Sequence, residues 1–98
     1  MTDILSLDTF LGLVGERCTA TAPGLEPLGL TLGSAVALGN PGGPDARAPF
    51  SLTFAGPAQP VLPQRIYTVA HDRLGTLDIF LVPLGPRGDA MLYEAIFT

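Results

Sequence analysis

The fold is decided by residues 61–98, VLPQRIYTVAHDRLGTLDIFLVPLGPRGDAMLYEAIFT, which read as three consecutive β-strands joined by short turns. The predicted strands cover residues 65–71, 76–84 and 90–97. Residues 72–75 and 86–89 join them and are rich in the glycine, proline and aspartate that favour tight turns. The succession predicts an antiparallel meander.

The strand predicted at 76–84 is apolar on both faces, because Leu77, Ile79 and Leu81 alternate with a second set that is apolar except for Asp78. A strand covered on both sides has this pattern. The strand at 90–97 is also apolar on both faces. One face of the sheet can point to the interior, so we expect the other face to be covered in part by the N-terminal helix and in part by another subunit. Pro83 lacks an amide hydrogen and predicts an edge or a bulge near the end of its strand. The candidate interface consists of Phe80, Val82, Leu84, Leu92 and Ile96.

A short helix is predicted at residues 6–14, where Leu7, Phe10, Leu11 and Val14 follow helical spacing. Ser6 can cap its start, and Gly15 can end it in a left-handed conformation. Such a short helix depends on tertiary contacts to persist.

Three further strands are predicted at residues 16–22, 28–38 and 50–55. Gly29 and Gly33 indicate a bulge, a bend or a close backbone approach in the second of them. In the third, Phe50, Leu52 and Phe54 are expected to face the core, with Ser51 and Thr53 facing out. Residues 39–48 are predicted to form a loop, and residues 56–63 an extended connection anchored by Val61 and Leu62. We expect one domain over residues 1–98: a mainly β, six-stranded antiparallel barrel or rolled sheet with one short N-terminal helix.

The composition points to a covered surface. Charged residues make up 14% of the 98 residues, against about 25% in typical soluble domains, while apolar residues reach 47%. Large exposed apolar patches usually mark interaction sites. The five basic residues are all arginines, they are scattered, and the net charge is −4. Nucleic acid is therefore not an expected partner, because phosphate contacts need clustered basic residues.

No apolar run approaches the ~20 residues that a membrane-spanning helix needs, so a membrane is not expected as a partner. The first residues include Asp3 and Asp8 and lack a basic start, which predicts cytoplasmic synthesis without a signal peptide. The protein could still become part of an assembled or released particle. Cys18 is the one cysteine, which excludes an internal disulfide.

Short motifs spread over most of the chain carry a family resemblance. They are LDTFLGLVG at 7–15, PFSLTF at 49–54, LPQ at 62–64, Tyr67, HDRLG at 71–75, DIFLVP at 78–83 and YEAIF at 93–97. Together they resemble a family of small bacterial proteins known chiefly as a domain of unknown function. Members often lie beside genes for phage-tail-collar-like proteins, so the resemblance implies a link to a tail-like or filamentous assembly. The family carries no catalytic residues to transfer.

No catalytic, cofactor-binding or metal-binding constellation stands out. His71 is the one histidine, and its place beside Asp72 favours a hydrogen-bonded turn residue over a nucleophile pair with Cys18 or a triad with Ser34 or Ser51. His71, Asp72 and Asp78 are a poor ligand set for zinc. The GNPGG run lacks the lysine of a phosphate loop, and the tripeptide Arg-Gly-Asp at 87–89 is explained by turn formation.

These observations favour a structural subunit that assembles with itself or with a tail-like or filament protein, a tail-collar-like protein being the partner that the resemblance implies. The alternative is a binding module that holds a small molecule or a peptide at the barrel mouth or on the loop at 39–48. An enzyme is not expected, and neither is a cofactor.

Overall fold

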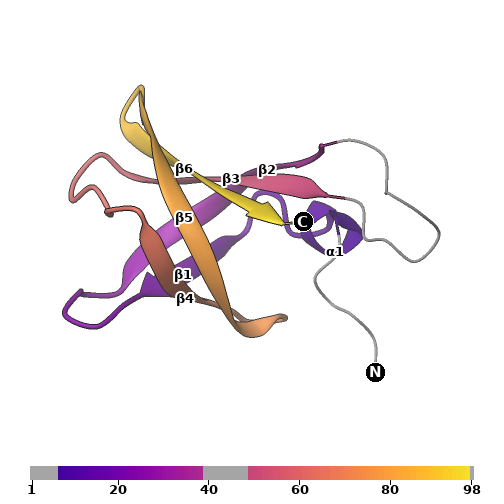
Figure 1. Ribbon diagram of the computed structural model, residues 1–98, viewed down its shortest axis with the longest axis horizontal. Coiled ribbons are helices and arrows are strands. Elements are labelled where there is room, and N and C mark those ends of the chain that lie inside the picture. The colour runs from indigo at the N-terminus through magenta and orange to yellow at the C-terminus, as the bar shows by residue number, and fades with distance from the viewer. Residues whose placement is uncertain (1–6, 39–48, 98) are drawn as a thin grey trace.

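The computed structural model describes residues 7–38 and 49–97, which form a closed six-stranded antiparallel barrel with one short helix (Figure 1). The elements are α1 (Leu7–Leu11), β1 (Arg17–Thr21), β2 (Leu28–Ala37), β3 (Phe50–Pro57), β4 (Arg65–His71), β5 (Gly75–Arg87) and β6 (Ala90–Phe97). Their order around the barrel is β1-β2-β3-β6-β5-β4, and β4 returns to β1. The predicted fold class is confirmed. The predicted cap Ser6 and the predicted loop at 39–48 lie outside the described residues.

Two strands bend to close the barrel. The first part of β2 pairs with β1 and the rest pairs with β3, and the register shifts between Leu32 and Ser34. β5 pairs first with β4 and then with β6, and its register shifts between Pro83 and Gly85. Bulges bend a strand and increase its local twist. The two bulges therefore lie where β2 changes its partner from β1 to β3 and where β5 changes its partner from β4 to β6. They are close to Gly33 and Pro83, where the sequence predicts an irregularity.

β5 is longer than the predicted 76–84, because the bulge lets pairing continue past Pro83 to Arg87. Pro86 lies opposite Met91 and Arg87 opposite Ala90, so the expected turn at 86–89 is a tighter one through Gly88 and Asp89. The φ of Gly88 is 61°, a conformation that glycine adopts without steric cost. β3 likewise extends beyond the predicted 50–55, to Pro57.

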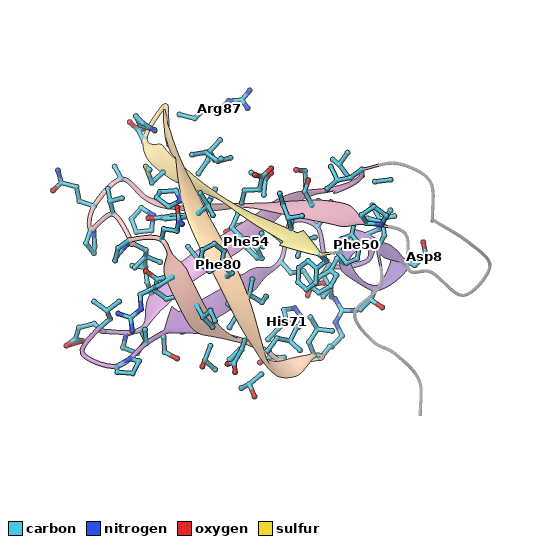
Figure 2. All side chains as sticks on the ribbon, viewed as in Figure 1. Asp8, Phe50, Phe54, His71, Phe80 and Arg87 are labelled. Carbon is cyan, nitrogen blue, oxygen red and sulfur yellow. The ribbon has the colours of Figure 1, made fainter. Side chains whose placement is uncertain are left out.

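The core lies inside the barrel and is sealed by aromatic rings at the end where α1 sits. The Phe50 ring stacks on Phe97 with centroids 4.9 Å apart, and Phe10 of α1 lies 5.8 Å and 5.5 Å from these two rings. Figure 2 shows Phe50 beside α1, at the tip of the sheet formed by β2, β3 and β6. The side chains with the least exposure are Tyr67, Tyr93, Phe50, Leu30, Leu52 and Leu81.

The helix differs from the prediction. It ends at Leu11, and the Leu13 amide donates to the Phe10 carbonyl at 2.9 Å, a tighter turn than an α-helix makes. This turn brings Leu13 into the core and leaves Leu11 and Val14 exposed, so the predicted stripe is wrong at these two positions. Gly15 has the expected left-handed backbone, with a φ of 93°.

Ser51 lies on the outer face of β3, the side predicted for it, but it is buried there between the larger side chains of Val36 and Ile96. One other expectation is wrong. Val61 was expected to anchor the connection before β4, but it is half exposed, and Leu62 alone is buried.

The Leu62 anchor supplies a stability prediction. Its amide donates to the Tyr93 hydroxyl at 2.8 Å, and Tyr93 is fully buried. Tyr93→Phe leaves this buried N–H without its partner, so we expect it to lower the free energy of unfolding by about 1–3 kcal/mol. Urea denaturation of both proteins measures the difference, and an unchanged midpoint would contradict the role given to this bond.

Candidate functional site

The barrel carries large apolar side chains on its outside. The described chain exposes Leu11, Val14, Leu25, Val36, Leu38, Val61, Ile66, Phe80, Leu84 and Ile96 by 37–60% each. Three of the five candidate interface residues are in this set: Phe80 at 49%, Leu84 at 52% and Ile96 at 57%. Val82 and Leu92, the other two, are half-buried. We define the outer apolar surface as Ile66, Phe80, Val82, Leu84, Leu92 and Ile96.

The β-ladders position this surface on β4, β5 and β6. Ile66 of β4 lies directly opposite Phe80, and directly opposed side chains on one face of a sheet are close neighbours. Phe80 and Val82 share a face of β5 because they are two residues apart. On β6, Leu92 lies opposite Gly85, which has no side chain to cover it. Figure 2 shows Phe80 over the middle of β5.

Few charges interrupt the outer apolar surface. Asp78 is occupied by a hydrogen bond from the Thr68 hydroxyl at 3.0 Å, across the β4–β5 ladder. The Arg65 guanidinium lies 5.9 Å from the centre of the Tyr67 ring. Glu94 is half-buried opposite Val82. Since charged side chains are the usual barrier to contact between sheets, this surface is only weakly protected.

A second group of functional side chains, the Glu16 cluster, joins the start of β1 to the β4–β5 turn. The Glu16 carboxylate contacts His71 Nε2 at 2.8 Å and also accepts a hydrogen bond from the Arg73 guanidinium. The Arg73 amide donates to His71 Nδ1 at 2.9 Å, so the ring hydrogen lies on Nε2, which donates to Glu16. His71 is thus the hydrogen-bonded turn residue that the sequence favours.

The sequence gives no sign of Glu16 in this role, because it precedes its partners by 55 and 57 residues. The hydrogen bonds from Arg73 and then His71 lower the pKa of the Glu16 carboxyl below its ordinary 4.5. Its ionised form is therefore favoured by folding.

This lowered pKa predicts a pH dependence of stability. The Glu16 contribution is fully present above about pH 4.5, the ordinary value for the carboxyl, and is lost as the pH falls through the lower folded pKa. Glu16→Gln should therefore be less stable than wild type near neutral pH, and the difference should shrink in acid. Denaturation at about pH 7 and about pH 3 measures it, with the exposed Glu26→Gln as the control. A difference that is equal at both pH values would contradict this role.

Cys18 and His71 line the same cavity, although nothing in their spacing along the chain favours a pair. The cavity has a volume of about 20 Å³ and lies beneath Phe10 and Leu13, so it holds no more than about one water molecule. Burial raises the pKa of the Cys18 thiol to about 11. The thiolate that a nucleophile requires is scarce near neutral pH, and His71 is already bonded to Glu16 and Arg73.

The other residues weighed for chemistry do not converge. Asp78 bonds to Thr68, and Ser51 is on the outer face of β3, whereas His71 lines the inner cavity. Among the residues that the structure describes, no group of three His, Cys, Asp or Glu side chains is placed to hold a metal ion. Arg87 ends β5 at the β5–β6 hairpin, away from α1 (Figure 2).

A larger pocket of about 370 Å³ opens where the β1–β2 turn meets the connection before β4. Its lining is mostly apolar: Gly24, Leu25, Glu26, Pro27, Leu28, Pro60 and Leu62. Glu26 is the one charged side chain of that lining. The sequence analysis gives a barrel mouth as one alternative for a binding site, but the residues of this pocket could not be identified from the sequence.

Comparison with known proteins gives a family without an assigned activity. The family model described as "Domain of unknown function (DUF6916)" matches residues 5–97. No curated protein and no solved structure matches the chain. Within the described residues, no helix is both long and apolar enough to cross a membrane.

Proposed function

We propose that this chain, which belongs to the DUF6916 family of domains of unknown function, is a structural subunit that associates with further copies of itself. The contact is the outer apolar surface on β4, β5 and β6. The observation that carries the proposal is the exposure of Phe80, Ile66 and Ile96 on a barrel with very few charges.

The area of this surface suits a protein interface. A large apolar side chain that is about half exposed presents on the order of 100 Å². The four half-exposed residues and the two half-buried ones, at about half that area each, therefore present roughly 500 Å² in total. A standard interface buries about 800 Å² on each partner, and a little more than half of that area is apolar. The outer apolar surface therefore matches the apolar share of one standard interface.

A second copy is the occupant that fits this surface. Copies meet across a two-fold axis through the same patch, so the patch must be compatible with itself. The part of the outer apolar surface around Ile66 and Phe80 has this property, because these two directly opposed side chains are neutral. Two carboxylates lie on the same face: Asp78, which bonds to Thr68, and Glu94, which is half-buried opposite Val82.

The particle we propose is tail-like or filamentous, as the family resemblance implies, and it could include a tail-collar-like protein. Negative-stain electron microscopy of the concentrated protein tests this form of the proposal. Filaments or rings are expected. A field without extended particles, from protein that light scattering shows to be associated, would restrict the proposal to a small oligomer.

The apolar pocket at the β1–β2 turn favours a second candidate function, a module that binds a small apolar molecule or peptide. Its volume of about 370 Å³ is within the range of small-ligand sites. A fluorescent apolar probe such as anilinonaphthalene sulfonate tests it. Saturable binding that is lost in Leu25→Asp, and kept in Phe80→Asp, would support this function. Binding lost equally in both variants, or absent, would reject it.

A further inference from the structure

β5 changes its partner halfway along its length. Residues 75–81 pair with β4, and the ladder with β6 begins only at Val82, opposite Glu94. Figure 1 shows β5 and β6 diverging from the point where they cross, towards the C-terminal end of β6. Within the described residues, the side of 75–81 that faces away from β4 therefore belongs to no ladder.

The backbone groups on this open side can be assigned by alternation. Successive residues of an antiparallel strand direct their N–H and C=O groups to opposite sides. Gly75 closes the β4–β5 hairpin opposite His71. We therefore assign its groups to the β4 side, and alternation assigns those of Leu77 and Ile79 to the same side. The N–H and C=O groups of Thr76, Asp78 and Phe80 then face the open side.

β2 has a similar stretch, but it is covered. Its ladder with β1 ends at Thr31 opposite Arg17. Beyond it, the Gly15 amide donates to the Leu32 carbonyl and the Leu32 amide donates to the Glu16 carbonyl, and α1 also packs against β2. β5, in contrast, packs against β4 and β6. Natural proteins protect free edges with lysine, proline or a bulge, and residues 75–81 contain none of these. Asp78 is the only charge on this edge.

We propose that residues 75–81 of β5 pair antiparallel with the same residues of a second copy, which joins β4 and β5 of both copies into one sheet. This inference rests on the proposed self-association and names the strand that mediates it. The edge is complementary to itself, as a two-fold contact requires. The contact is continuous with the outer apolar surface, since Phe80 is part of this edge and Ile66 is its neighbour across the β4–β5 ladder.

The charge of Asp78 selects the register. Like charges directly opposite each other destabilise a sheet, so we expect that the Asp78 residues of the two copies do not lie opposite each other. A shift that places Asp78 opposite Phe80 of the other copy avoids this repulsion, and the two-fold axis then passes between the two Ile79 residues. The two Phe80 rings become diagonal neighbours across the axis, within reach of each other.

Asp78→Pro and Asp78→Ala test the pairing as a matched pair. Both remove the carboxylate and its bond to Thr68, but only proline also removes the amide that faces the open side. We expect Asp78→Ala to associate like wild type and Asp78→Pro to associate at least about tenfold more weakly, as measured by sedimentation velocity. Equal association of the two variants would overturn the proposed pairing.

Amide hydrogen exchange on the wild-type protein tests the same claim without a variant. The amides of Thr76, Asp78 and Phe80 should exchange at least about tenfold more slowly in concentrated than in dilute protein, whereas Leu77 and Ile79 should be protected in both. Equal rates at both concentrations, in protein that does associate, would reject β5 pairing and leave the proposed function standing. A wild-type protein that stays monomeric would reject both.

Discussion

Replacing Phe50 by alanine is expected to lower the free energy of unfolding by about 3–5 kcal/mol. Phe50 is fully buried, and its ring stacks on Phe97 and contacts Phe10. Its removal leaves a cavity where α1 meets the end of the barrel. Since small domains have only about 5–15 kcal/mol of stability, this loss is a large part of the total, and we expect the variant to be partly unfolded at room temperature.

Phe80→Ala is the matched control for this substitution. It removes the same ring from a half-exposed position on the outside of β5, so we expect a loss below about 1 kcal/mol in the isolated chain. Circular dichroism during urea denaturation, in dilute protein, measures both variants. Equal losses for Phe50→Ala and Phe80→Ala would contradict the placement of the core.

Phe80→Asp is expected to weaken self-association by at least about a hundredfold while leaving the barrel folded. Placing a carboxylate at the centre of an apolar contact requires its desolvation without a partner, which costs several kcal/mol. A loss of about 2.7 kcal/mol already corresponds to the hundredfold change. The fold should persist, because the side chain is exposed in the isolated chain.

Val61→Asp is the control for the added charge. Val61 is exposed to the same degree, 50% against 49% for Phe80, but lies in the connection before β4 and not on the outer apolar surface. Sedimentation velocity of the two variants against wild type distinguishes a specific contact from a general effect of charge. Equal association of Phe80→Asp and wild type would exclude Phe80 from the interface.

The meander and the barrel could be predicted because a period of two in the sequence reports directly which face of a strand is buried. Phe50, Leu52 and Phe54 alternate in the sequence and are all buried in the structure. β4 and β6 begin and end where the pattern places them. The glycine and proline near the two bulges mark the bends of β2 and β5.

The buried side chains of the helix were harder to predict, because they depend on the conformation of a single turn. Ideal helical spacing places Val14 in the core, but a tight turn after Phe10 rotates the chain and buries Leu13 in its place. Ser51 shows the same dependence on tertiary neighbours. Its burial comes from side chains on β2 and β6 that lie beside it only after the strands pair.

The candidate site divides in a similar way. β5 and β6 are each apolar on both faces, and only one face of a strand can point into the barrel interior. The apolar side chains of the other face, among them Phe80, Leu84 and Ile96, are therefore exposed. The Glu16 cluster could not be foreseen, because its members come together only through the pairing of β1 with β4. Which side of β5 remains open likewise depends on where its ladders begin and end.

Sedimentation equilibrium of the wild-type protein over a wide range of concentration tests self-association most directly. The chain has a mass of 10.2 kDa. We predict an average mass of at least twice this value in concentrated protein, falling towards that of one chain on dilution. A mass of 10.2 kDa at every concentration would contradict the account.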